Sequence, residues 1–167
     1  MNGTNQGGNF YGKFRGVVSD NSDPSMLGRI RAKVPDVLGD EESSWALPAV
    51  PYAGDGVGLF LIPPTDTSVW IEFEHGDPDY PIWSGCFWVE GEVPASPAIA
   101  DKKVLKTDTA TITLDDTPGA GGITLEVNNG PKIKLSATGI EIDDGQGGTI
   151  KLTGPKVSIN DSALEVT

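Results

Sequence analysis

The C-terminal part of the chain, residues 105–167, contains no aromatic residue and no arginine. Aliphatic residues separated by single polar residues recur through it, and glycines lie between these groups. Such alternation predicts short β-strands with one apolar face, and glycine permits sharp corners between them. A degenerate repeat of this kind is typical of a stacked architecture. The aliphatic positions are Ile112, Leu114, Ile123, Leu125, Val127, Ile133, Leu135, Ile140, Ile142, Ile150, Leu152, Val157, Ile159, Leu164 and Val166.

Strands this small predict a protein that folds only as an oligomer. Each strand would present two or three aliphatic side chains to one face, too few for a stable core in one short chain. Three copies wound around one axis would turn these stripes inward, and strand edges would pair between neighbouring chains. We therefore expect an intertwined triple-stranded β-helix, a homotrimer, whose core positions run from Ile112 to Ile159 in the list above.

The polar positions of the same strands are predicted to face solvent. Lys134 and Lys151 are expected to lie near Glu126, Glu141 or Asp143 on neighbouring strands. Each such exposed pair contributes at most about 1 kcal/mol to stability. Their main expected effect is therefore to keep the assembly soluble.

The N-terminal half has a different composition, because all twelve aromatic residues lie between Phe10 and Trp88. Alternating and continuous apolar runs, separated by turn-forming Asn, Asp, Pro and Gly, predict five strands with a longer irregular piece at 37–56. Five strands in such a span predict a small closed barrel of the OB type, so the whole chain is expected to be all-β. The predicted strands lie within residues 10–20, 28–36, 57–63, 67–76 and 81–88.

Two of these strands alternate clearly enough to predict which residues share one face, and the run 57–63 is apolar throughout, as expected of a buried strand. The composition break predicts a flexible arm at 1–9, an OB-fold domain at 10–89, a linker at 90–104 and a trimeric β-helix at 105–167. The residues predicted to share one apolar face of each alternating strand are Ile30, Ala32 and Val34 in the first, and Val69, Ile71 and Phe73 in the second.

Charge and composition exclude several classes of function. The net charge of −12 argues against a nucleic-acid partner, since a phosphate-binding surface needs clustered Lys and Arg. No apolar run approaches the roughly 20 residues of a membrane helix, and the N-terminus does not resemble a secretory signal. The single cysteine, Cys86, allows no intrachain disulfide, which fits assembly in a reducing cytoplasm.

The ionisable residues indicate no catalytic, cofactor or metal site, so the protein is not expected to be an enzyme. His75 is the only histidine, and one His without a second ligand is a poor zinc site. Asp77 and Asp79 flank a proline and are expected to shape a turn. The stretch IDDGQGG, residues 142–148, occurs once, so a solvated corner is favoured over a calcium-binding repeat. Cys86 is expected to be a small core residue.

Two alternatives remain open from the residues alone. Trp45, Trp70, Trp83 and Trp88 could form a stacking platform, which would make the protein an OB-fold module for glycan or nucleic acid with a trimerisation stalk. A paired-carboxylate cell-wall hydrolase would need two carboxylates about 5 to 9 Å apart across a cleft. The acidic net charge and the predicted trimeric tail favour a structural role for the tryptophans and the carboxylates.

Three segments of the N-terminal half resemble one known family. They are SDNSDPSMLGRIRAKVP (19–35), SSWALPAVPYAGDGVGLFLIPP (43–64) and VWIEFEHGDPDYPIWSGCFW (69–88). As a set they resemble the OB domain of phage baseplate assembly protein V and of VgrG-type spikes, over about residues 10–88. In that family a trimeric β-helix follows the OB domain, which agrees with the expectation from the tail.

The resemblance implies a central spike of a contractile injection machine, such as a phage tail, a tailocin or a related secretion device. It implies a baseplate hub protein at the OB end, a PAAR-repeat cap at the C-terminal tip, and mechanical piercing of the target cell envelope. Assembly is expected in the producing cell's cytoplasm, within a baseplate that becomes part of a virion or a secreted, extracellular particle. The tip or cap contact is assigned to Leu164, Glu165, Val166 and Thr167.

The sequence also departs from this family in three ways. Residues 65–69 lack the Gly-x-x-V pattern found before the fourth strand, which affects the local turn. Only about nine residues precede the OB segment, so the hub is expected to be a separate chain. The iron-binding His-x-His pattern of some short phage spikes is absent, which removes that metal site.

Overall fold

The computed structural model describes residues 8–161 and 163–166. The chain divides between Gly91 and Glu92 into two compact units, each described here by itself. Nearly all regular structure is β; the helical pieces are the single turn α1 (Pro35–Leu38) and the 3₁₀ segment η1 (Glu74–Gly76). Among the described residues, no helix has the length and apolar character needed to cross a membrane.

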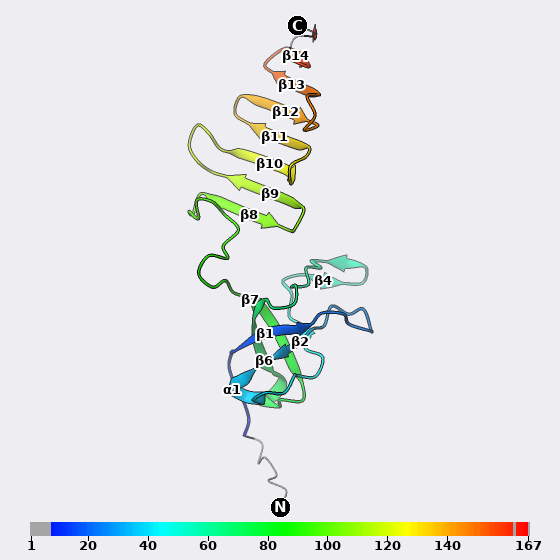
Figure 1. Cartoon of the computed structure of the whole chain (residues 1–167), viewed down its shortest axis with the longest axis vertical. Coiled ribbons are helices and arrows are strands. Elements are labelled where there is room, and N and C mark those ends of the chain that lie inside the picture. The colour runs from blue at the N-terminus through cyan, green and yellow to red at the C-terminus, as the bar shows by residue number, and fades with distance from the viewer. Residues whose placement is uncertain (1–7, 162, 167) are drawn as a thin grey trace, which may run out of the picture. The chain divides into compact units, whose positions relative to one another are not determined.

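The first unit, hereafter the OB unit, contains a five-stranded sheet in the order β2-β1-β6-β7-β3. Figure 1 labels β1, β2, β6 and β7 of this sheet. Neighbouring strands are antiparallel except for β3 and β7, which are parallel. A separate two-stranded sheet joins β4 and β5. The strands are β1 (Phe14–Asp20), β2 (Arg31–Lys33), β3 (Leu47–Pro48), β4 (Ala53–Gly54), β5 (Val57–Gly58), β6 (Ser68–Phe73) and β7 (Pro81–Cys86).

The core of the OB unit lies on the faces that alternation predicts. Every second residue of β6 is buried, because successive side chains of a strand point to opposite faces. Ile30 and Ile71 are fully buried, and the ring centroids of Phe14 and Phe73 lie 5.7 Å apart. The predicted faces are therefore confirmed. The buried cluster comprises Val18, Ile30, Ala32, Val34, Ala46, Val69, Ile71, Phe73 and Trp83.

The expected buried strand at 57–63 is wrong. Only Val57 and Gly58 are in a strand, in a hairpin with β4 that is hydrogen-bonded to no other strand of the described sheets. Leu59, Phe60 and Leu61, which follow the hairpin, are exposed, because no other strand of the described residues pairs with this segment. The fifth strand of the main sheet is instead β3, which lies inside the segment expected to be irregular.

The expectation that Cys86 is a core residue is also wrong. Cys86 is the last residue of β7, and its thiol is exposed. The register between β6 and β7 shifts near this end, between Val69 and Ile71, so the regular inward–outward alternation is not continued to the end of β7. An apolar strand pattern does not show where such a shift occurs.

The second unit, hereafter the tail unit, is one antiparallel sheet of eight strands in which each strand pairs with the next along the chain. Its first strand begins at Lys102, within the segment expected to be a linker. The strands are β8 (Lys102–Lys106), β9 (Ala110–Asp115), β10 (Gly122–Val127), β11 (Lys132–Ser136), β12 (Gly139–Asp143), β13 (Thr149–Thr153), β14 (Lys156–Ile159) and β15 (Leu164–Val166).

The pairing within the tail unit differs from the expected pairing of strand edges between chains. Both edges of each strand from β9 to β14 are occupied by neighbours of the same chain. Among the described strands of this unit, only β8 and β15 have a free edge. Chains that associate along β9 to β14 must therefore meet through the faces of their sheets, because no backbone edge is open there.

Candidate functional site

One face of the tail unit is lined by two parallel columns of aliphatic side chains. The register places Leu125 opposite both Ile112 and Ile133, while Ile123 lies opposite Leu114 and Leu135. Cross-strand neighbours in register share one face of a sheet, so the columns continue from strand to strand without interruption. The first column is Ile112, Leu125, Ile133, Ile142, Ile150 and Ile159, and the second is Leu114, Ile123, Leu135, Ile140, Leu152 and Val157.

This aliphatic face is uncovered in the single chain. Exposed fractions run from 37% at Ile133 to 49% at Val127 for eleven of the thirteen predicted core positions, and Val157 and Ile159 are half-buried. Contiguous exposed apolar surface of this kind marks an interaction site. The structure thus brings together on one face the residues that the alternation predicts; their contact with other chains stays a prediction.

One member of this face is not predicted by the pattern of the sequence. Leu105 of β8 lies in register with Ile112 and is 45% exposed. Its own segment, KKVLK, shows no clean alternation of apolar and polar residues, so the signal was too weak to separate it from the preceding linker. The register with β9 is the observation that adds it to the first column.

The opposite face of the tail unit carries polar and charged side chains. Lys151 Nζ lies 3.8 Å from a carboxylate oxygen of Glu141, as expected, and 2.9 Å from one of Asp161. The hydrogen bond to Asp161 and the nearby negative charges raise the pKa of Lys151. Lys132 and Asp143 form another cross-strand pair at 3.6 Å. These pairs are partly exposed, so each contributes little to stability.

Carboxylates at the corners of the tail sheet accept hydrogen bonds from backbone amides. The Asp144 carboxylate accepts hydrogen bonds from the N–H groups of Gln146 and Gly148, both at 2.8 Å, and these bonds lower its pKa. The loop is exposed, as expected of a solvated corner. At the β9–β10 corner the Thr117 hydroxyl and N–H donate to Asp115, which lowers the pKa of that carboxyl.

Two glycines allow adjacent strands to approach more closely than other residues would. Gly122 and Gly139 begin β10 and β12 with φ values of 154° and 140°. A Cβ atom at Gly122 would overlap the carbonyl oxygen of Leu135, and one at Gly139 would overlap that of Leu152. Both sites therefore require glycine for space as well as for conformation.

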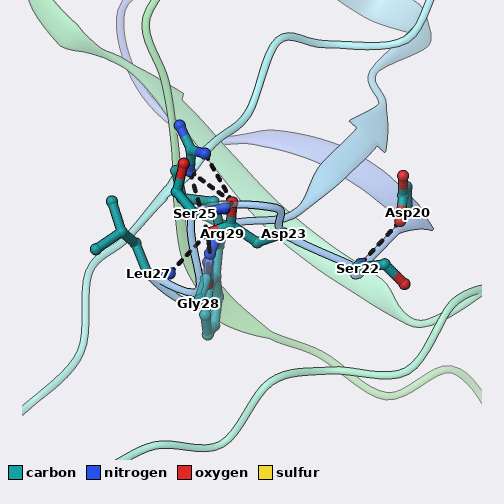
Figure 2. Close-up of polar contacts among 8 residues, drawn as sticks. Asp20, Ser22, Asp23, Ser25, Leu27, Gly28 and Arg29 are labelled. Atoms are coloured by element: carbon teal, nitrogen blue, oxygen red, sulfur yellow. Dashed lines mark hydrogen bonds and ion pairs between the residues drawn. The ribbon is translucent and has the colours of Figure 1, made fainter.

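The OB unit contains a loop organised around one buried carboxylate (Figure 2). The side chain of Asp23 is 4% exposed and accepts hydrogen bonds from the N–H groups of Ser25 and Leu27 at 2.9 and 2.8 Å. The guanidinium of Arg29 contacts the same carboxylate at 2.7 Å. The hydrogen bonds from Arg29, followed by those from the backbone, hold the pKa of Asp23 far below its ordinary value.

Asp23 should make the OB unit sensitive to acid. Because its pKa is lowered in the folded state, the stabilisation it supplies is fully present above the unfolded pKa of about 4 and is lost as the pH falls below that value. We expect Asp23→Asn to lower Tm at pH 7, and the gap to wild type to shrink below about pH 4. Thermal unfolding from pH 7 to pH 3 tests this, with exposed Asp36→Asn as control. A gap independent of pH would contradict it.

The four tryptophans do not share one surface. Trp83 is buried in the core of the OB unit. Trp70 lies half-buried on the opposite face of the sheet, with its ring 4.7 Å from that of Phe87. Trp45 is half-buried beneath two arginine side chains, and Trp88 is 64% exposed. A single platform of all four rings, as the binding-module alternative would use, is therefore not formed.

The turn after β6 holds the remaining candidate residues. His75 adopts a φ of 54° within η1, and the Asp77 carboxylate accepts a hydrogen bond from the N–H of Asp79 at 3.0 Å. These are the turn-shaping positions that the sequence predicts. Within residues 8–161 and 163–166, no group of three or more His, Cys, Asp and Glu is placed to hold a metal ion.

Comparison with known proteins assigns both units. Residues 14–88 match the family described as the type VI secretion system/phage-baseplate injector OB domain. Residues 102–165 match the phage baseplate V C-terminal trimerisation domain. The first range spans the five-stranded sheet, and the second spans the tail unit from β8 into β15. These two matches cover most of the chain.

A curated relative adds a more distant link. The chain is 41% identical over 64 residues to the type VI secretion system spike protein VgrG4b of Pseudomonas aeruginosa. That match covers 35% of this chain and only 8% of the relative, which is a far longer protein. With both units assigned and the aliphatic face lying within the trimerisation domain, the chain belongs to the phage baseplate V and VgrG-type family of spike proteins.

Proposed function

We propose that three copies of this chain form the central, cell-puncturing spike of a contractile injection machine. The observation that carries the proposal is the uninterrupted aliphatic face of the tail unit, which is exposed in one chain and lies in a trimerisation domain. Three such faces turned toward one axis bury the columns against each other. Each Leu or Ile then gains part of the roughly 1.5–3 kcal/mol that full burial provides.

The mechanism is mechanical. Sheath contraction drives the tube forward, and the trimeric tail concentrates the force on a small area of the target envelope. Its stiffness comes from continuous antiparallel pairing of β8 to β15 within each chain and from close packing of the shared interior. The polar outer face, with pairs such as Lys151 and Glu141, keeps the rod soluble before firing.

The two ends of the chain serve different partners in this proposal. The OB units dock to a baseplate hub protein and join its wider ring to the narrow tail. The C-terminal end around β15, whose outer edge is free among the described strands, forms the tip or the seat of a PAAR-repeat cap. Of the assigned tip residues Leu164, Glu165, Val166 and Thr167, the last lies outside the described residues.

The spike acts without catalysis in this proposal, and it binds no nucleic acid. The family to which it belongs consists of structural baseplate and spike proteins. The backbone N–H of Asp79 donates to the Asp77 carboxylate within one turn, which supports a structural role for this segment rather than a pair of carboxylates facing each other across a cleft. Assembly takes place in the cytoplasm of the producing cell, and the finished baseplate is part of a virion or a secreted particle.

The proposal is tested on contractile particles purified from the producing cells. Gold-labelled antibody against this chain should mark the centre of the baseplate, and particles lacking the chain should not inject. Complementation with wild type should restore injection, whereas complementation with Leu152→Asp should not. Label on the sheath or fibres, or undiminished injection without the chain, would overturn the proposal, and release of fragments from peptidoglycan by purified trimer would overturn its non-enzymatic part.

A further inference from the structure

The OB unit has an apolar surface that the core does not use. Six exposed apolar residues, here called the hairpin patch, line one groove of about 400 Å³ between the loop after β1 and the β4–β5 hairpin. Their exposed fractions run from 45% to 86%. Exposed apolar surface gathered into one groove marks a site of interaction. The hairpin patch consists of Met26, Leu27, Tyr52, Val57, Leu59 and Phe60.

Both walls of this groove are held in place. On one side, the hydrogen bonds to Asp23 fix the loop, and Leu27 points away from the Asp23–Arg29 cluster (Figure 2). On the other side, the N–H of Leu59 donates to the carbonyl of Tyr52 at 2.9 Å. A Cβ atom at Gly28 would lie 2.9 Å from Ile62, so glycine is what lets the two walls meet. A surface fixed in this way loses little entropy when a partner covers it.

The charges of the OB unit indicate what kind of partner fits. Residues 1–91 contain thirteen Asp and Glu against five Lys and Arg, so copies of this unit repel each other over most of their surface. None of the described residues that line the groove is charged. The hairpin patch is therefore the surface through which two acidic copies can approach with the least electrostatic cost.

We infer that the hairpin patch of each chain packs against the OB unit of a neighbouring chain in the trimer. The inference rests on the trimer of the proposed function. A trimeric tail would hold three OB units on short tethers, which raises their effective concentration to about the millimolar range. A head-to-tail contact closes into a ring when three copies are related by a threefold axis. In such a trimer the exposed run at 57–61 would be covered by a neighbouring chain, just as the aliphatic face of the tail unit would be.

Hydroxyl-radical footprinting of the full-chain trimer, with no other protein present, tests the inference. Met26 and Phe60 are 86% and 72% exposed in the single chain. Their oxidation in the wild-type trimer should fall several-fold relative to the Leu152→Asp chain. Tyr80, which is 61% exposed and lies outside the patch, should react equally in both. Light scattering on the same samples reports the oligomeric state.

Phe60→Asp supplies a second reference, a trimer in which the hairpin patch is uncovered. This reference does not depend on the Leu152→Asp chain being folded. It should remain a trimer through its tail, and its Met26 should become several-fold more reactive than in wild type; Tyr80→Asp should leave Met26 protected. Equal reactivity of Met26 in the wild-type and Phe60→Asp trimers would overturn this inference without affecting the proposed function. The hairpin patch would then be a binding surface for a different protein, such as a hub. A wild-type chain that is monomeric would overturn the proposed function itself.

Discussion

Leu152→Asp is expected to abolish the trimer and leave single chains. Leu152 lies in the second column of the aliphatic face, in register with Ile140 and Val157, and is 38% exposed in the single chain. In a trimer the substitution places three carboxylates in a dry interior without partners. Each unpaired buried charge costs on the order of several kcal/mol, which exceeds what one buried Leu contributes.

Size-exclusion chromatography with light scattering measures this outcome directly. Wild type should show three times the chain mass of 17.5 kDa, and Leu152→Asp should show the mass of one chain. Thr153→Asp is the matched control, because the neighbouring residue of β13 lies on the opposite, polar face. It should remain a trimer. A stable Leu152→Asp trimer at neutral pH would show that the aliphatic face is not the trimer interior.

Gly139→Ala is expected to destabilise the tail and shift its unfolding to clearly lower temperature. The added Cβ would overlap the carbonyl oxygen of Leu152, which belongs to the backbone and cannot turn aside. The residue also has a φ of 140°, which favours glycine. Overpacking of this kind costs about 1–3 kcal/mol per site, and a trimer contains the site three times.

Gly147→Ala separates the overlap from the backbone conformation. Gly147 has a φ of 106°, but a Cβ atom there would meet nothing within 4 Å. Thermal unfolding followed by circular dichroism should therefore show a much larger fall in Tm for Gly139→Ala than for Gly147→Ala. Equal falls in the two variants would mean that backbone strain alone explains the effect and that the close approach of β12 and β13 is unimportant.

Periodicity predicted the parts of this protein in which one face of a strand is buried and the other is solvated. The inward residues of β6, such as Val69 and Ile71, and the aliphatic columns of the tail both follow a period of two. Such a pattern depends only on the alternating geometry of a strand, so it can be read before any partner is known. The short motifs of the OB unit were sufficient to predict its family.

Periodicity failed where a residue's environment depends on what lies beside its own strand. The run 57–63 is apolar like a buried strand, yet its hairpin has no covering layer in the described structure. The two-residue strand β3 is too short to show any period. Cys86 is exposed because it ends β7 beside a register shift. None of these features is a property of the local sequence.

The sequence by itself determined that this protein is all-β and that its tail has one aliphatic and one polar face, and it predicted that the aliphatic face packs against other copies. These results follow from side-chain chemistry and strand geometry, which act over a few residues. Only the tertiary structure decided that tail strands pair within one chain, that Asp23 organises the loop of residues 23–29, and that the hairpin patch is exposed. Each of these features depends on which segments, distant in the sequence, come into contact. Backbone hydrogen bonding and side-chain packing determine those contacts together, so they cannot be read from a short stretch of sequence.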